Sequence, residues 1–214
     1  MIPCKICGTP TTSFRIDQMN ILFHECSFCE FIFKDESHYI TEEKELEKYD
    51  MHHNDDDNIG YVNFLTNFVD AAVMPYIKSG SALDFGSGPN PVLSRILSEK
   101  YPFQVDIYDL HYSKDKIYES KKYQLITSTE VVEHLANPLE YFELFHSLLL
   151  PKGILSIMTL FYPKDKKQFA NWFYIRDVTH LSFFTPKTLE QIAKLVGFQM
   201  IYTNEYRYAV FLKK

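Results

Sequence analysis

The sequence predicts an α/β fold in which helices cover both faces of a mainly parallel sheet, preceded by a small cysteine-bearing module. Strand-like and helix-like segments alternate from Ser81 onward, which is the pattern of a parallel sheet with crossover helices. The last two strand-like segments are too close together for a crossover helix, so they should pair antiparallel. All four cysteines lie within the first 29 residues, which places the module at the N-terminal end.

The composition is that of an ordinary globular chain. The 214 residues are 46% hydrophobic and 23% charged, which suits one full-sized domain with a small appendage and excludes wholesale disorder. A net charge of −6 lacks the basic excess of a typical nucleic-acid binder. No apolar run reaches the roughly 18 residues of a membrane span, and the first residues do not resemble a secretory signal. We therefore expect a cytoplasmic protein without a transmembrane helix.

Cysteine spacing defines the first of three segments, the module at 1–34. Cys4 and Cys7 form one C-x-x-C pair, Cys26 and Cys29 form another, and 18 residues separate the pairs. This spacing is typical of a zinc ribbon with four thiolate ligands, which leaves no coordination position open and so indicates a structural site. Iron bound in a rubredoxin-like manner and a pair of disulfides are the alternatives.

Short strands should complete the module, and a charged connector at 35–58 should follow it. We expect strands at 12–16, 21–24 and 30–33, with His24 as a strand residue rather than a metal ligand. In the connector, 42–48 is predicted to be helical. His52, His53 and the acidic run 55–57 are interpreted as solvated residues near a pocket entrance.

The α/β domain at 59–214 opens with a predicted helix, because apolar residues recur with a helical period between 60 and 76. The segments that follow alternate between strands and helices. We predict strands at 81–85, 103–109, 124–129, 153–160, 198–204 and 207–212, and helices at 91–100, 138–149 and 186–196, the last with Thr185 as its N-cap.

The loop after the first strand of this domain carries the strongest binding signal. In LDFGSGPNP an apolar strand turns through G-x-G into a helix; Gly86 permits a tight turn and Gly88 lets a ligand approach the backbone. Asn90 is predicted to cap the helix and Pro91 to take its first position. Pro91 stands where a dinucleotide-binding loop has its third glycine, and no G-K-[ST] follows, so a phosphate cradle is disfavoured.

A nucleoside ligand without phosphates suits this loop best. Asp109 lies 21 residues beyond Gly88, at the end of the next strand, where a carboxylate can accept the hydrogens of both ribose hydroxyls. A glycine-rich turn with two incidental aspartates is the alternative interpretation. The coupling of strand, loop, helix and spaced acid favours the binding site.

Four segments together resemble class I S-adenosylmethionine-dependent methyltransferases of the type 11/23 group: LDFGSGPNP, VDIYDL, YQLITSTEVVEHLANPLEYF and THLSFFTPKTLEQIAKLVGF. The resemblance covers residues 60–214, and within this class the chain is most similar to enzymes with a zinc ribbon in front. It implies a Rossmann-like sheet of seven strands, one of them antiparallel. The third strand of that pattern, near Ile117 and Tyr118, is short and poorly defined in this sequence.

The resemblance also implies a set of cofactor-binding residues. Those expected around the methionine part of S-adenosylmethionine are Asp84, Gly86, Ser87, Gly88, Thr129 and Glu130, with Asn90 in the same loop. Asp109 would hold the ribose and Leu110 would lie beside the adenine, while Tyr61 would close over the cofactor.

The segment E-x-x-E-H, with Glu130, Glu133 and His134, follows the 124–129 strand. Ubiquinone-type O-methyltransferases share this pattern and can bind a divalent cation there, and two carboxylates with an imidazole are plausible ligands for such an ion. In the alternative interpretation, Glu133 and His134 cap the next helix and form hydrogen bonds within the loop.

Aromatic and polar residues are concentrated between 172 and 184, where these enzymes insert acceptor-binding elements. His180 titrates near neutrality and could take a proton from an acceptor hydroxyl or amine, and Asp177 could orient it. In the alternative interpretation, Asp177 and His180 only fix the loop over packed aromatic rings. The candidate catalytic residues are therefore His180, His134 and Asp177.

Methyl transfer from S-adenosylmethionine to a small-molecule acceptor is the function that these observations predict. A tRNA or protein methyltransferase that docks its substrate with the ribbon is one alternative, although the net charge disfavours nucleic acid. A protein that binds the cofactor without catalysis is the other alternative.

Overall fold

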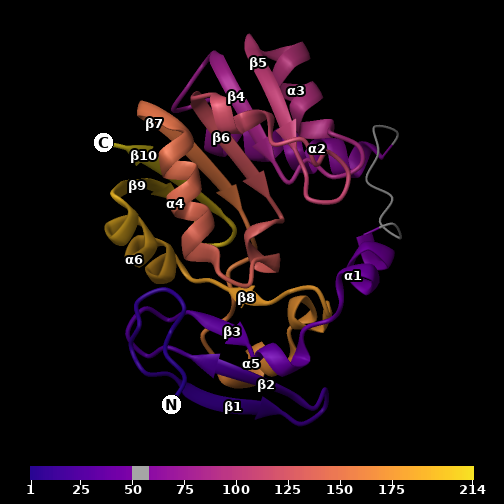
Figure 1. The fold of residues 1–214 in the computed structure, drawn as a ribbon, viewed down its shortest axis with the longest axis vertical. Coiled ribbons are helices and arrows are strands. Elements are labelled where there is room, and N and C mark those ends of the chain that lie inside the picture. Colours follow the sequence, from indigo (N-terminus) through magenta and orange to yellow (C-terminus); the bar gives the residue numbers. More distant parts are fainter. Residues whose placement is uncertain (50–57) are drawn as a thin grey trace.

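A computed structural model describes residues 1–49 and 58–214 of the chain. The described chain contains two sheets, one of six strands and one of four, which lie one below the other in Figure 1. His52, His53 and 55–57, which we interpreted as solvated connector, lie outside the described residues. None of the described helices has the length and apolar character needed to cross a bilayer.

The larger sheet has the strand order β5-β4-β6-β7-β10-β9. Its strands are β4 (Gly80–Phe85), β5 (Phe103–Tyr108), β6 (Tyr123–Thr129), β7 (Leu149–Met158), β9 (Phe198–Thr203) and β10 (Tyr208–Lys213). Strands β5, β4, β6 and β7 run parallel, whereas β10 is antiparallel to both of its neighbours, β7 and β9. The prediction of a mainly parallel sheet with one antiparallel strand is therefore confirmed.

This described sheet has six strands where the resemblance implied seven. The segment near Ile117 and Tyr118 forms a 3-10 helix (Ile117–Ser120) instead of an edge strand. Only the 14 residues 109–122 separate β5 from β6, which is too few for a crossover, a further strand and a return crossover. The Tyr118 ring instead packs beside Tyr108, with the ring centroids 5.0 Å apart.

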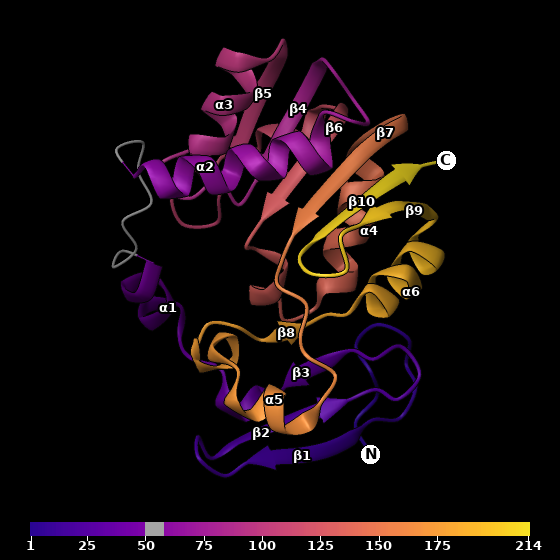
Figure 2. The ribbon, with the colours of Figure 1, turned by 180° about the vertical axis from the view of Figure 1, so that it is seen from behind.

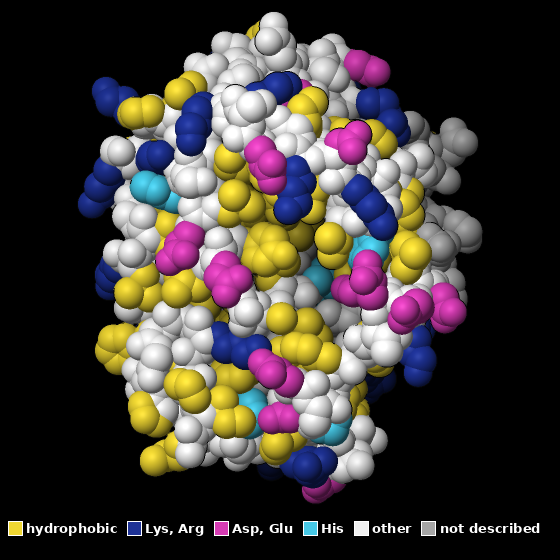
Figure 3. Space-filling view, viewed as in Figure 1, with side chains coloured by type: hydrophobic (Ala, Val, Ile, Leu, Met, Phe, Trp, Pro, Cys, Tyr) yellow, Lys and Arg dark blue, Asp and Glu magenta, His cyan; other side chains and the backbone are white. Residues whose placement is uncertain are grey.

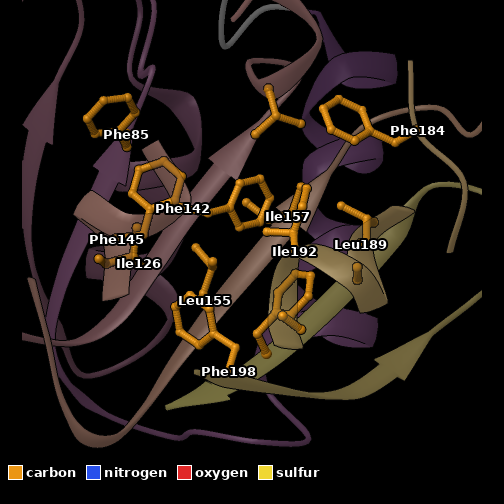
Figure 4. Close-up of a cluster of buried hydrophobic side chains, with 14 of the residues drawn as sticks. Phe85, Ile126, Phe142, Phe145, Leu155, Ile157, Phe184, Leu189, Ile192 and Phe198 are labelled. Atoms are coloured by element: carbon orange, nitrogen blue, oxygen red, sulfur yellow. The ribbon is translucent and has the colours of Figure 1, made fainter. Parts of the chain in front are cut away.

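Helices cover both faces of the larger sheet (Figures 1 and 2). One face carries α2 (Ile59–Phe68), which continues into a π-helical segment (Val69–Val73), and α3 (Val92–Lys100); the other carries α4 (Pro138–Leu148) and α6 (Pro186–Val196). Each face has its own hydrophobic cluster. Figure 4 shows the cluster on the second face, where side chains of α4, α6 and β7 interlock.

N-cap residues were predicted for two helices, and the two predictions had opposite outcomes. Thr185 caps α6 and forms a capping box with Thr188, as the predicted N-cap should. Helix α3 instead begins at Val92, and Pro91 rather than Asn90 stands at its N-cap position. The expectation that Asn90 caps this helix is wrong, because Pro91 has a ψ of 64° and so keeps a non-helical backbone.

The N-terminal module contains three of the four strands of the smaller sheet. These are β1 (Thr12–Ile16), β2 (Ile21–Glu25) and β3 (Ile32–Lys34), and the predicted hairpin is confirmed. The third strand begins later than expected because Glu30, with a φ of +60°, still belongs to a turn. His24 lies in β2, where its ring contacts Ser13 Oγ at 2.9 Å and Asp35 Oδ2 at 2.7 Å, so it is a strand residue as expected.

The fourth strand of the smaller sheet comes from the far end of the chain. Strand β8 (Ser182–Phe183) pairs antiparallel with β3 and gives the order β1-β2-β3-β8. The remaining helical elements are α1 (Glu42–Tyr49), α5 (Lys166–Asn171) and 3-10 helices at Glu36–His38, Val132–His134 and Phe173–Arg176. The segment between β7 and α6 therefore lies against the module, as Figure 2 shows.

Candidate active site

A cavity of about 520 Å³ lies beyond the carboxyl ends of β4, β5 and β6. Parallel sheets bind ligands at this end of their strands. Hydrophobic and histidine side chains surround a recess near the middle of the face that Figure 3 shows. The cavity wall includes every residue predicted to bind the cofactor: Tyr61, Asp84, Gly86, Ser87, Gly88, Asn90, Asp109, Leu110, Thr129 and Glu130.

The glycine loop has the backbone geometry that its sequence requires. Gly86 and Gly88 have φ values of +84° and +67°, in the region that side chains of L-residues rarely adopt. A Cβ atom on Gly86 would lie 2.2 Å from Val131 Cγ2, so Gly86 allows close packing. A Cβ atom on Gly88 would meet no atom within 4 Å, so this position borders open space inside the cavity wall.

Asp109 ties the glycine loop to the end of β5. Its Oδ2 accepts a hydrogen bond from the Gly88 N–H at 2.9 Å, and its Oδ1 accepts from the N–H groups of His111 at 2.9 Å and Tyr112 at 3.1 Å. The residue is 9% exposed and lines the cavity. A carboxylate has further lone pairs, so these oxygens can still accept hydrogen bonds from a ligand.

Asp84 is a buried carboxyl group at the end of β4. Burial raises its pKa to about 7, while a hydrogen bond donated by Thr127 Oγ1 at 3.0 Å acts in the opposite direction. A carboxyl group in this state can exchange a proton near neutrality, and a cationic ligand group would favour the ionised form.

Two further carboxyl groups contact one hydroxyl group: Glu130 lies in the cavity wall, and Glu133 is fully buried outside it. The Tyr174 hydroxyl contacts Glu130 Oε2 at 3.2 Å and lies still closer to Glu133 Oε1. Burial raises the pKa of Glu130 to about 7 and, together with the charge of Glu130, that of Glu133 to about 8. Among the described residues, Glu130 Oε1 and Glu133 Oε2 are buried without a hydrogen-bond partner. Burial therefore favours the neutral form of both carboxyl groups.

His134 and His180 complete this end of the cavity, with ring centroids 4.7 Å apart. The Nδ1 of His134 lies 3.2 Å from the carbonyl oxygen of Thr179, and the Nδ1 of His180 lies 2.8 Å from that of Tyr174. A carbonyl can only accept, so each Nδ1 carries the proton. In the neutral imidazole, each Nε2 then has a lone pair.

Asp177 also lines the cavity, but its carboxylate accepts hydrogen bonds from Thr179 N at 2.9 Å and Thr179 Oγ1 at 2.7 Å. Although burial raises its pKa, these bonds lower it further, so the group stays ionised. The Nδ1 of His180 contacts the Tyr174 carbonyl, and the backbone N–H of His180 donates to the Asp177 carbonyl at 3.3 Å. Likewise, Glu133 and His134 do not cap α4, which has Asn137 at its N-cap position.

A family model described as a methyltransferase domain matches residues 61–203. The chain belongs to this methyltransferase family. Methyltransferases of this family use S-adenosylmethionine as their cofactor. No curated protein matches the chain in sequence.

Solved structures show the methyltransferase fold as well. An O-methyltransferase family protein from Burkholderia thailandensis has a TM-score of 0.51 at 10% identity, over 72% of this chain and 55% of that one. The mitomycin 7-O-methyltransferase MmcR has a TM-score of 0.54 at 9% identity, over 73% and 55%. The chain thus spans about half the length of each of these two proteins.

The sequence did not reveal the contribution of α1 to this methyltransferase site. Glu45 and Tyr49 line the cavity, and the Tyr49 hydroxyl donates to Glu45 Oε1 at 2.8 Å. The Tyr49 ring stands edge-on to His134, with the centroids 5.4 Å apart. The sequence of α1 is that of a charged, solvated helix. Only the position of α1 beside the cavity therefore identifies these two side chains as residues of the site.

The four cysteines of the methyltransferase form one cluster. The Sγ atoms of Cys4 and Cys29 are 3.6 Å apart, those of Cys7 and Cys26 are 3.5 Å apart, and those of Cys7 and Cys29 are 3.6 Å apart. Four thiolates about 2.3 Å from a tetrahedral zinc ion stand roughly 3.8 Å from one another. The cluster therefore fits zinc, and the separations are too long for disulfides.

Proposed function

We propose that this methyltransferase transfers a methyl group to a nucleophilic atom of a small acceptor molecule held beside Glu130, His134 and His180. The observation that carries this proposal is one continuous cavity with the glycine loop at one end and two histidines at the other. The net charge of −6 disfavours nucleic acid as the acceptor, as does the dispersal of Lys and Arg among acidic side chains in Figure 3.

The residues at the glycine-loop end fit S-adenosylmethionine. The open space beside Gly88 allows a ligand to approach the backbone, and Asp109 presents acceptors for ribose hydroxyls. Asp84 offers a carboxylate to an amino group, and Leu110 and Tyr61 provide apolar and aromatic walls. When bound, S-adenosylmethionine supplies a methyl group that its positive sulfur activates toward in-line attack.

The chain's own residues bind and orient the acceptor and remove its proton. Tyr49, Tyr61 and Tyr141 line the cavity and keep water from the reacting atoms. His180 Nε2 takes the proton of an acceptor hydroxyl or ammonium group, and the Tyr174 carbonyl holds the ring in the required tautomer. Positioning supplies much of the acceleration, because the activated methyl group needs little further chemistry.

Calorimetry with S-adenosylhomocysteine, the demethylated product, tests the cofactor half of this proposal. Binding at one site per chain is expected, and its absence would refute the enzymatic function. A screen of small-molecule acceptors with labelled S-adenosylmethionine tests the other half. His180→Gln should retain S-adenosylhomocysteine binding and lose turnover. If the cofactor binds and no acceptor is methylated, the protein is a cofactor-binding protein without catalysis.

A divalent cation is the second candidate occupant of the acceptor end. One ligand atom from each of Glu133, His134 and His180 lies within 4.8 Å of the others, whereas Glu130 is outside this group. Histidines that bind metals commonly donate their other ring N–H to a carbonyl, as both rings do here. Titration with Mg²⁺, Mn²⁺ and Zn²⁺ of the protein and of Glu133→Gln tests this site. Binding that Glu133→Gln does not weaken would assign the ion elsewhere.

A further inference from the structure

The cysteine module and the acceptor segment are built as one unit. Strand β8 lies between β3 and the cavity residues, with Ile32 opposite Phe183 and Phe33 opposite Ser182. The Lys34 N–H extends this pairing to the Leu181 carbonyl at 2.9 Å. The segment that carries Asp177 and His180 is therefore attached to a sheet whose other strands lie about 150 residues earlier in the chain.

Side chains reinforce this attachment at the second cysteine pair. The Thr188 hydroxyl donates to the Cys29 carbonyl at 2.9 Å, and the Tyr162 hydroxyl donates to the Glu30 carbonyl at 2.6 Å. The Thr185 hydroxyl donates to Glu30 Oε2 at 3.1 Å. The backbone that presents the cysteine ligands is thus fixed by the segments on both sides of β8.

Lys34 is the buried residue at the centre of this contact. Its side chain is only 1% exposed, and its ammonium group donates to the Val178 carbonyl at 2.9 Å. Burial lowers its pKa to about 8, and the charge of Asp177 opposes this effect. A buried lysine is costly to desolvate, and one hydrogen bond to a carbonyl recovers little of that cost. Its burial therefore points to a positional role rather than to a gain in stability.

The loop above Lys34 reaches from the module to the E-x-x-E-H segment. Asp177 accepts two hydrogen bonds from Thr179, and the Leu181 N–H donates to the Glu133 carbonyl at 2.7 Å. The Ser182 hydroxyl donates to the Leu135 carbonyl at 2.7 Å. Lys34 thus contacts the loop of residues 177–182 from the module, while the same loop also contacts the E-x-x-E-H segment at the acceptor end of the cavity.

We propose that Lys34 is a positioning residue for acceptor binding: it fixes residues 177–180 from the cysteine module, so that the module forms part of the acceptor site. The link between loop position and acceptor binding rests on the proposed function. The support of the loop by Lys34 does not, and it is tested without an acceptor.

The test compares Lys34→Met with the matched variant Lys5→Met in the zinc-loaded chain of 214 residues. Methionine keeps the apolar stem of lysine and removes its donor, while Lys5 lies in the same module and contacts Glu36 and Tyr39 instead of the loop. Amide hydrogen exchange, the ring resonances of His180 and calorimetry with S-adenosylhomocysteine are measured for both.

In Lys34→Met, we expect the amides of 178–181 to exchange at least about 10-fold faster, because a charge-assisted hydrogen bond is lost. The His180 resonances should shift, while the glycine-loop amides and the S-adenosylhomocysteine affinity stay unchanged. The midpoint of thermal unfolding should change by no more than about 4 °C, since the buried charge is also removed. Lys5→Met should leave the loop as it is. Lys34→Gln, which retains an N–H donor, should fall between Lys34→Met and the wild type.

Three results would overturn the proposal. Unchanged exchange at 178–181 in Lys34→Met would show that the ammonium group does not hold the loop. Equal acceleration in the glycine loop, or failure of both Lys34→Met and Lys34→Gln to fold, would show that it supports the whole fold. If the wild type does not bind S-adenosylhomocysteine, the proposed function is refuted, but the conclusion that Lys34 supports the loop still holds.

Discussion

Replacing Asp109 with Asn tests the cofactor end of the cavity most directly. The carboxylate of Asp109 accepts from Gly88 on one oxygen and from His111 and Tyr112 on the other. An Asn side chain has one carbonyl oxygen and one NH2 group, so it can offer an acceptor to only one of these two sides. In Asp109→Asn, at least one backbone N–H therefore faces another donor.

The structure sets the expected size of this effect. A buried N–H without an acceptor costs about 1–3 kcal/mol of unfolding free energy. For a domain of this length, the loss lowers the thermal midpoint by roughly 2–12 °C. Asp109 also faces the cavity, where the proposed function requires it to accept ribose hydroxyls. With the charge and one acceptor removed, we expect the Kd for S-adenosylhomocysteine to rise by a factor of about 10 or more.

Calorimetry and thermal unfolding measure the two effects separately, with Asp106→Asn as the matched control. Asp106 lies in β5, the strand that Asp109 directly follows, and its carboxylate contacts Lys121 and Tyr123 outside the cavity. The control should bind S-adenosylhomocysteine within about twofold of the wild type. If Asp109→Asn is less stable and still binds as tightly as the control, the carboxylate only braces the loop and the ribose assignment is refuted.

Four further perturbations test other parts of the structure. Gly88→Ala should weaken S-adenosylhomocysteine binding and cost only about 1–2 kcal/mol in chemical denaturation, because it strains the backbone without a clash. Gly86→Ala should cost more because its Cβ would meet Val131, and equal costs would contradict this account. Burial raises the pKa of Asp84 from 3.8 to about 7, so its contribution to stability is present below pH 3.8 and is lost as pH rises through 7. As the pH rises from about 5 to 7.5, the unfolding free energy of Asp84→Asn, measured in urea, should therefore fall less than that of the wild type. One proton changes this free energy by at most about 1.4 kcal/mol per pH unit. If the two plots of unfolding free energy against pH are parallel, the burial argument is refuted. If the four cysteines bind zinc as their spacing predicts, its removal by a chelator should shift the emission of Trp172, the single tryptophan, whose ring packs on Phe183 in β8. The affinity for S-adenosylhomocysteine should be preserved. Unchanged emission would contradict the coupling of the module and the acceptor segment.

The sequence predicted those features whose causes are local. The turn at Gly86 and Gly88 and the cap at Thr185 each depend on a few adjacent residues, and the structure contains both. The prediction that Asn90 is the N-cap of α3 was wrong, because one backbone angle decides whether Asn90 or Pro91 takes this position. The six-strand sheet differs from the expectation because the segment around Tyr118 is too short for a further strand and its two crossovers.

The acceptor end depends on contacts between residues far apart in the chain, and this is why sequence patterns could not assemble it. Lys34 reads as a polar residue at the end of a strand, and its burial depends on Val178, 144 positions later. The same arrangement is relevant to the alternative hypothesis that the ribbon docks a tRNA or protein substrate. The edge of β3 is already occupied by β8, so β1 and β8 are the two edge strands of this sheet and β1 is the edge that belongs to the module. A large substrate docked on β1 would lie across the sheet from β8, the strand that follows His180 in the chain.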